Sequence, residues 1–292
     1  MDITLALGGG GSRGYAHIGV IRRLEQEGFR IKAIAGTSFG GIVGVLYAAG
    51  YRPNDLEEMF CALDQKRLYG HAPEDGPSLI GLAGVRQQLI TILGDRTFDS
   101  LRIPFAVTAT DLKSGSEVVL TSGLLLDAIL ATIAMPGIFP ARHIGDFELV
   151  DGGTLDPVPV VPARALASRF PVVAVSLTLP MGSAARSWSV PLPAYVPRVL
   201  IDRFSRMRYG LVLDVVMRSM DISGRAMTAY RLEVDKPDVI IRPQVGNIDT
   251  LDIINVREVI KMGEQAVDEA LPMLKQKFTL RKRIRRALGA RA

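Results

Sequence analysis

The stretch Ile34-Ala35-Gly36-Thr37-Ser38-Phe39-Gly40-Gly41 decides the fold class of this chain. An apolar run leads into it and predicts a buried strand, and the apolar run that follows predicts a buried helix closed by glycine. Between them, Gly36, Ser38 and Gly40 form a G-x-S-x-G pattern. A sharp strand-to-helix turn needs small residues on both sides of its centre and pushes the central side chain outward, which presents a serine hydroxyl as a nucleophile. An ordinary N-cap serine in a glycine-rich turn would give the same pattern, so the rest of the chain has to decide.

A strand and a helix precede this turn. Residues 3–7 predict a strand, and residues 16–28 carry apolar side chains at helical spacing. The order strand, helix, strand predicts a parallel sheet with a right-handed crossover. The fold class is therefore α/β, and further strands are expected at residues 103–110, 117–121, 147–150, 172–177 and 238–243.

A glycine-rich loop joins the first strand to the first helix. Gly9, Gly11 and Gly14 satisfy the dinucleotide-binding pattern, but that site needs an acid at the end of the second strand, where residues 36–38 are Gly-Thr-Ser. The loop also lacks the lysine of a phosphate-binding Walker loop. The remaining functional interpretation is an anion cradle, in which backbone N–H groups and a helix N-terminus hold an oxyanion one strand away from Ser38.

An acidic residue follows the strand expected at residues 147–150. Asp151 is followed by Gly152 and Gly153, which is compatible with a plain turn. The same position at a strand end also suits a catalytic carboxylate at the edge of the sheet where Ser38 emerges.

The histidines argue against an α/β-hydrolase triad in the order Ser, acid, His. The chain has three, His17, His71 and His143, and none of them follows Asp151. His17 is expected to be structural and His71 solvated, whereas His143, close to Asp151 in the sequence, stays open as a participant. The simpler arrangement is a dyad in which Asp151 accepts the proton of Ser38.

Composition limits the class of protein. Apolar residues make up 48% of the 292 residues, which suffices for a large core. The single Cys61 excludes an internal disulfide and argues against a cysteine metal site. The first residues do not resemble a signal peptide, and no apolar run has the length of a membrane span, so a cytoplasmic protein is expected.

Charge is concentrated at the C-terminus. Residues 275–292 carry +8, so the remainder carries −3 of the total of +5. Leu280, Ile284 and Leu288 share one face of a helix flanked by arginines. A basic amphipathic helix of this kind binds anionic lipid, which predicts a peripheral contact with the inner face of the membrane; a solvated tail is the alternative, and nucleic-acid binding is not expected.

Two internal regions carry no motif. Residues 52–100 are expected to be mostly helical and show no pattern of a chemical site. Residues 181–230 are interpreted as either a mobile cover over a site or a surface excursion. We therefore expect one hydrolase domain over residues 1–274, followed by the tail at 275–292.

Four motifs in the same order resemble those of bacterial patatin-like phospholipases, over about residues 3–160. They are Gly10-Gly11-Ser12-Arg13-Gly14, Gly36-Thr37-Ser38-Phe39-Gly40, the block from Ala131 to Pro140, and Asp151-Gly152-Gly153. The third block has Thr132 where serine is common in the family.

The resemblance implies a three-layer α/β/α sandwich with a mainly parallel sheet. It implies metal-independent hydrolysis of lipid acyl esters without a cofactor, with Ser38 as nucleophile and Asp151 as base. The N–H groups of Gly10 and Gly11 would form the oxyanion hole, with Arg13 supporting their loop. The expected substrate is a membrane phospholipid or lysophospholipid.

Two alternatives stay open beside this interpretation. The same dyad suits an acyl-thioester or small-ester hydrolase or an acyltransferase. A non-catalytic regulatory or nucleotide-binding protein could use the glycine loop without the dyad. The patterns also leave head-group preference and oligomeric state open.

Overall fold

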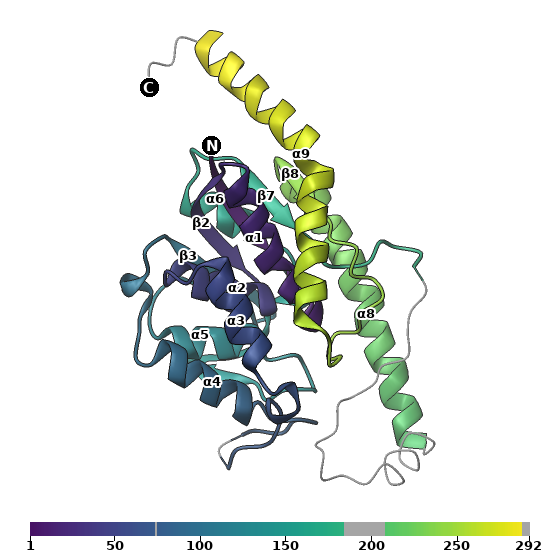
Figure 1. Ribbon diagram of the computed structural model, residues 1–292. Helices are drawn as coiled ribbons and strands as arrows, with labels where there is room; N and C mark the ends of the chain where they lie inside the picture. Colours follow the sequence, from purple (N-terminus) through teal and green to yellow (C-terminus); the bar gives the residue numbers. More distant parts are fainter. Residues whose placement is uncertain (74, 184–207, 288–292) are drawn as a thin grey trace.

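The computed structural model describes residues 1–73, 75–183 and 208–287, with residues 208–210, 213 and 280–287 described by their backbone alone. Within these ranges a central sheet lies between two layers of helices, which confirms the predicted α/β/α sandwich (Figure 1). The strands are β1 (Asp2–Leu7), β2 (Arg30–Gly36), β3 (Phe105–Asp111), β4 (Ser116–Leu120), β5 (Arg142–Ile144), β6 (Phe147–Asp151), β7 (Val172–Val175) and β8 (Val239–Ile241).

The sheet has the order β5-β6-β3-β2-β1-β7-β8, and β4 pairs with β3. The strands from β3 to β8 in this order run parallel to their neighbours, as predicted. At the other side, β4 and β6 pair antiparallel with β3, and β5 pairs antiparallel with β6. Sequence analysis missed β5 because its three residues, Arg-His-Ile, are too few to display a period.

The α-helices are α1 (Ala16–Gln26), α2 (Phe39–Ala48), α3 (Pro53–Ala62), α4 (Ala83–Leu93), α5 (Leu125–Thr132), α6 (Val160–Leu166), α8 (Arg208–Asp235) and α9 (Val256–Ala287). On one face of the sheet α1 lies beside α9, with α2 next to α1 (Figure 1). The opposite face is covered by α6 and part of α8.

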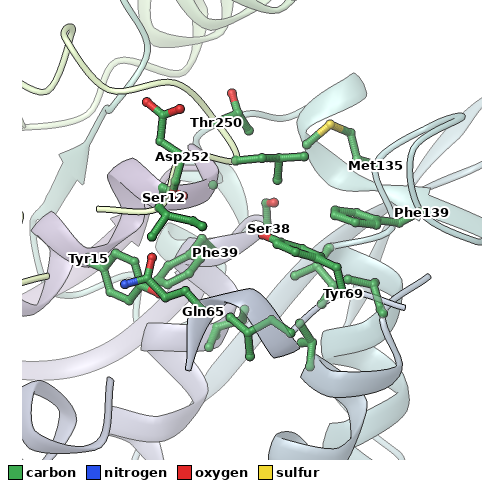
Figure 2. A pocket seen from close by; sticks show the side chains of 18 residues that line it. Ser12, Tyr15, Ser38, Phe39, Gln65, Tyr69, Met135, Phe139, Thr250 and Asp252 are labelled. Carbon is green, nitrogen blue, oxygen red and sulfur yellow. Dashed lines mark hydrogen bonds between the residues drawn. The ribbon is translucent and has the colours of Figure 1, made fainter. Parts of the chain in front are cut away.

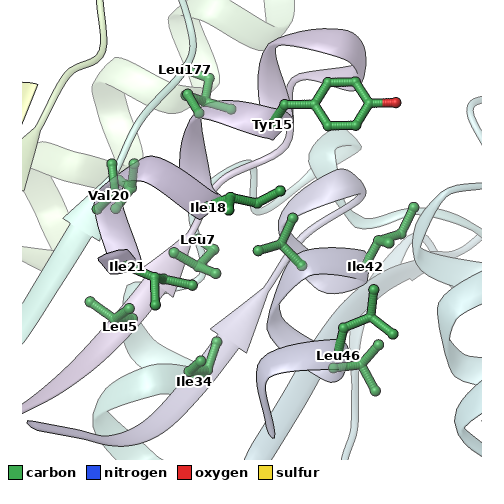
Figure 3. Packing of buried hydrophobic residues seen from close by; sticks show 14 of the residues in the cluster. Leu5, Leu7, Tyr15, Ile18, Val20, Ile21, Ile34, Ile42, Leu46 and Leu177 are labelled. Carbon is green, nitrogen blue, oxygen red and sulfur yellow. The ribbon is translucent and has the colours of Figure 1, made fainter. Parts of the chain in front are cut away.

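The two faces of the sheet differ in the size of their side chains. Large residues such as Leu5, Leu7 and Ile34 pack against α1 and α2 (Figure 3). The alternate positions carry alanines, such as Ala6 and Ala35, which pack against α6. Because side chains alternate along a strand, one face interdigitates with large helix residues and the other lets α6 approach closely.

This topology gathers three loops at one edge. The parallel strands β1, β2 and β7 end at the same edge, so the glycine loop, the turn at Ser38 and the segment after Val175 meet there. Gly8 N–H donates to Val175 O at 2.9 Å, and Thr37 N–H donates to Leu7 O at 3.0 Å. Ligands of open α/β sheets bind at the carboxyl ends of such strands.

The last helix runs past the predicted end of the body at residue 274. Lys275 forms an ion pair with Glu27 at 2.8 Å, and the ring of Phe278 packs edge-on against Phe29. The start of the predicted tail is thus attached to the body. The predicted apolar face of Leu280, Ile284 and Leu288 lies outside the described side chains.

Part of the predicted cover segment, residues 184–207, also lies outside the described residues, whereas residues 208–230 belong to α8. Among the described residues, no helix combines the length and apolarity needed to cross a membrane.

Candidate active site

Ser38 lies at the strained turn that the sequence predicted. Its backbone has φ 53° and ψ −126°, and in the described chain only Lys236 is another non-glycine residue with positive φ. A Cβ atom on Gly36 would lie 2.6 Å from the carbonyl oxygen of Gly40, and one on Gly40 would lie 2.2 Å from Leu7 O. No side chain fits at either position, so these glycines allow the turn that projects Ser38 from the start of α2.

Threonine hydroxyls hold this turn in place. The Ser38 N–H donates to Thr132 Oγ1 at 2.9 Å, and Thr132 donates in turn to Thr108 O at 2.7 Å. Thr37 Oγ1 donates to Asp156 O at 2.8 Å and lies 2.7 Å from Thr108 Oγ1. The strained backbone is therefore fixed by α5, β3 and the loop after β6, which is how strain persists at a functional site.

Asp151 reaches Ser38 across β3. In the sheet Gly36 pairs with Val107 and Asp151 pairs with Ala109, so β3 lies between the nucleophile strand and the acid strand. Ser38 and Asp151 line the same cavity, and the Ser38 hydroxyl lies close enough to the Asp151 carboxyl group to favour its charged form. Among the described residues, no histidine lines that cavity.

The environment of Asp151 makes it a stronger base than an ordinary aspartate. Burial raises its pKa to about 6, although hydrogen bonds from Ser38 and from Gly153 favour the charged form. Gly153 N–H donates to Asp151 Oδ1 at 2.7 Å, and the carbonyl of Gly152 accepts from Asp156 N–H at 2.8 Å. The two glycines after Asp151 therefore shape the loop that orients its carboxylate.

The glycine loop lies against the serine. A Cβ atom on Gly9 would be only 3.2 Å from the Cβ of Ser38. In the part of the chain that the structure describes, the N–H groups of Gly10 and Gly11 have no hydrogen-bond acceptor, although both residues line the same cavity as Ser38. Two unpaired donors beside a serine hydroxyl suit an oxyanion hole.

The loop is held from behind by the segment between β8 and α9. Ser12 N–H donates to Thr250 O at 2.8 Å, and the buried Arg13 donates from Nε to Ile248 O at 2.7 Å. Gly11 has φ 55°, and a Cβ atom there would lie 2.0 Å from Thr250 O. Arg13 therefore lies where the sequence expected a support for the loop, with its Nε–H bonded to the backbone of another segment.

None of the three histidines lines either of the two cavities at Ser38. His17 is buried in α1 with Nε2 2.7 Å from Gly8 O, and burial lowers its pKa to about 4, so it is neutral at physiological pH. His143 is exposed on β5 and lines neither cavity at Ser38. His71 is exposed in the loop before α4. Within the described ranges, no cluster of His, Cys, Asp or Glu side chains is placed to hold a metal ion.

Two cavities meet at Ser38. The smaller, of about 80 Å³, is lined mainly by apolar and aromatic side chains, including Phe39, Tyr69 and Phe139 (Figure 2). The larger, of about 550 Å³, is lined by Asp151, the glycine loop and one side of α8. Sequence analysis found no chemistry in residues 52–100, yet residues 65–85 contribute much of the wall of the smaller cavity.

Comparison with known proteins gives the family. The family model for patatin-like phospholipases matches residues 5–164, more than half of the chain. The chain belongs to the patatin-like phospholipase family. The resemblance inferred from the four motifs is thereby confirmed.

Individual relatives agree with this patatin-like assignment. An uncharacterized NTE family protein of Mycobacterium tuberculosis is 38% identical over 180 residues, covering 60% of this chain and 49% of the relative. Lysophospholipase NTE1 of Debaryomyces hansenii is 26% identical over 285 residues, covering 94% of this chain and 18% of that protein. The chain thus spans about half the length, or less, of these curated relatives.

A solved structure agrees with the patatin-like fold. The crystal structure of VipD from Legionella pneumophila superposes with a TM-score of 0.52 at 14% identity, covering 94% of this chain and 67% of that chain. At this identity the likeness concerns the fold alone.

One feature of this patatin-like site had no signal in the sequence. Arg231 of α8 reaches the fully buried Asp156, in the loop that follows Asp151, at 2.9 Å, and also contacts Glu117 and Asp235 at 3.0 and 3.3 Å. Burial raises the pKa of Asp156, while Arg231 opposes that rise. The ion pair joins residues 75 positions apart, so no local pattern could have revealed it.

Proposed function

We propose that this patatin-like chain hydrolyses acyl esters of phospholipids or lysophospholipids through a Ser38–Asp151 dyad. The observation that carries the proposal is the placement of Ser38 and the buried Asp151 carboxyl group in the wall of one cavity, beside the glycine loop. Strained backbone at Ser38 and a raised pKa at Asp151 are the properties expected of a nucleophile and its base.

In the first half-reaction, Ser38 Oγ attacks the ester carbonyl carbon as its proton passes to Asp151. The carbonyl oxygen becomes an oxyanion, which accepts hydrogen bonds from the N–H groups of Gly10 and Gly11. The positive end of α2, whose first residue is Phe39, adds to this stabilisation. When the intermediate collapses, the ester C–O bond breaks, and Asp151 returns the proton to the departing alcohol.

In the second half-reaction, water replaces the alcohol. Asp151 removes a proton from the water, whose oxygen attacks the acyl-enzyme carbonyl carbon. The Ser38 ester bond then breaks, Ser38 Oγ regains a proton from Asp151, and the free acid leaves. An aspartate with a pKa near 6 suits both directions of proton transfer at neutral pH better than one near 4.

The substrate class follows from the walls around Ser38. The smaller cavity is lined by side chains such as Tyr15, Ile42 and Leu82, which suit an alkyl chain. The name of the Debaryomyces relative, a lysophospholipase, supports lipid esters over thioesters.

The test measures fatty-acid release from phosphatidylcholine and lysophosphatidylcholine by the whole chain. We expect Ser38→Ala to abolish release, whereas Ser100→Ala should keep it, because Ser100 is exposed and lines neither cavity at Ser38. Full turnover by Ser38→Ala would overturn the proposal. Turnover of acyl thioesters but of neither lipid would favour the alternative chemistry, and tight dinucleotide binding without hydrolysis would favour the regulatory alternative.

A further inference from the structure

We propose that the two cavities at Ser38 divide the substrate between them. The smaller cavity takes the acyl chain that is cleaved, and the larger takes an alcohol half that carries an apolar chain of its own. The preferred substrate is then a diacyl lipid, whose leaving group is a lysolipid. This inference rests on the proposed hydrolase function.

The position of Asp151 assigns the leaving-group side. The base must return its proton to the departing alcohol oxygen, so that oxygen lies next to the Asp151 carboxylate. Asp151 and Gly10 line the larger cavity and are absent from the walls of the smaller one. The alcohol half therefore extends into the larger cavity, and the acyl chain leaves the reacting carbon in the other direction.

The smaller cavity suits one alkyl chain. Its walls include aromatic rings on several sides of Ser38, with Tyr15, Tyr69 and Phe139 among them (Figure 2). Asp252 is the charged residue in its wall, which contains no cation among the described residues to hold a phosphate. Val85 of α4 is a half-buried part of this wall, so a larger residue there should shorten the chain that fits.

The larger cavity has an apolar stretch on α8, beside polar side chains such as Ser219, Ser223 and Thr228. Along α8 its wall includes Val215, Val216, Met217, Met220 and Met227. Val215, Val216 and Met220 have exposed fractions of 56%, 46% and 36%, which is unusual for residues of this size on one short stretch. A contiguous exposed apolar surface marks a binding site for an apolar partner.

The charges in this cavity do not favour a bare polar alcohol either. Arg225, buried in the wall, forms an ion pair with Asp221 and donates from Nη1 to Ser183 O at 2.9 Å. This ion pair neutralises the charge of Arg225 in the wall of the larger cavity. A glycerophosphodiester alone would leave the apolar wall of α8 in water, whereas a lysolipid would cover it with its remaining chain.

The first experiment uses the unmodified chain and two substrates with the same acyl group and head group. Dipalmitoyl phosphatidylcholine and palmitoyl lysophosphatidylcholine are compared at equal surface concentration in mixed micelles with a nonionic detergent. We expect kcat/KM to be at least tenfold higher for the diacyl lipid. Equal rates, or a preference for the lysolipid, would overturn this inference while leaving the hydrolase function standing. Absence of hydrolysis of both lipids and of soluble esters would instead overturn the proposed function.

Variants of α8 test whether the alcohol half of the substrate occupies the larger cavity. Val216→Asn with Met220→Asn should lower the ratio of diacyl to lysolipid hydrolysis at least fivefold, because both side chains line the larger cavity. The matched control, Val212→Asn with Val234→Asn, changes exposed residues of the same helix outside that wall and should leave the ratio unchanged. A ratio that is unchanged in the first double variant would overturn the assignment of α8.

A variant of Val85 tests whether the cleaved acyl chain occupies the smaller cavity. On a series of soluble esters of increasing acyl length, Val85→Phe should move the optimum to shorter chains. An unchanged optimum in a variant with an unchanged melting temperature would overturn the assignment of the smaller cavity.

Discussion

In the proposed mechanism, Asp151 acts as a base in a place that disfavours its charge. Its carboxylate is buried, and burial raises its pKa to about 6, because water no longer stabilises the charged form. An exposed aspartate, with a pKa of about 4, would be mostly ionised above about pH 5 but would be a weaker base. The buried carboxyl group of Asp151 is ionised over a narrower pH range than an exposed one, but its carboxylate is a stronger base.

The pH dependence of the reaction tests this property. Only ionised Asp151 can accept the proton of Ser38, so kcat/KM on a soluble ester should fall about tenfold per pH unit below pH 6 and level off above it. The protein's circular dichroism, recorded at each pH, excludes unfolding as the cause. A limb near pH 4, or a flat profile between pH 4.5 and 8, would contradict the raised pKa.

A second prediction at the residue scale concerns Thr132, which holds the turn at Ser38. Its hydroxyl accepts from Ser38 N–H and donates to Thr108 O, so Thr132→Val removes one acceptor and one donor from these two backbone groups. Each loss costs about 1–3 kcal/mol, and we expect kcat/KM to fall at least tenfold. Thr132→Ser keeps the hydroxyl and should retain most of the activity; an equal loss in both variants would mean that the methyl group matters rather than the hydrogen bonds.

At the scale of elements, Arg231 joins α8 to the loop that follows Asp151 and contains Asp156. It is the shared cation of Asp156, Glu117 and Asp235, and the backbone carbonyl of Asp156 holds Thr37 beside the nucleophile. Removal of a cation from buried acids is costly, at about 3 kcal/mol or more. The helix that lines the larger cavity is thus attached to the same loop that positions Ser38.

Arg231→Met should therefore lower the melting temperature by several degrees and reduce kcat/KM on lipid. The matched control is Arg218→Met on the same helix, whose partly exposed ion pair with Asp214 is expected to contribute at most about 1 kcal/mol. Thermal unfolding and fatty-acid release are measured for both. Equal and small effects of the two substitutions would remove the special role of Arg231.

Sequence patterns revealed the elements that obey a clear period or motif. The strand, turn and helix around Ser38 and the glycine loop before α1 occur where expected, because local spacing determines them. The short strand β5 has no period to detect. The Arg231–Asp156 pair and the wall of the smaller cavity join distant residues, so only the tertiary structure could reveal them.

At the scale of the whole molecule, the later part of α9, around Lys275 and Phe278, and the candidate active site lie at opposite edges of the sheet. Glu27 and Phe29, which contact Lys275 and Phe278, come just before the start of β2, whereas Ser38 follows its end. Figure 1 shows the last turns of α9 projecting past the end of the molecule where the N-terminus lies. A lipid surface bound by the basic tail would thus meet the edge away from the cavities.

Truncation after Thr279 tests the predicted tail contact while keeping the part attached to the body. We expect the truncated chain to bind vesicles containing anionic lipid less tightly at low salt, because it loses six of the cations of residues 275–292. Its kcat/KM on a soluble ester should be unchanged. Co-sedimentation of both chains with anionic and neutral vesicles measures the binding, and equal binding would leave the tail without this role.

The nucleophile itself is best tested by labelling the folded chain with a fluorophosphonate and mapping the modified peptide. We expect a single adduct on Ser38, formed orders of magnitude more slowly in Asp151→Asn and at the unmodified rate in His143→Ala. An adduct on another serine, or labelling of Ser38 that is unaffected by Asp151→Asn, would contradict the dyad.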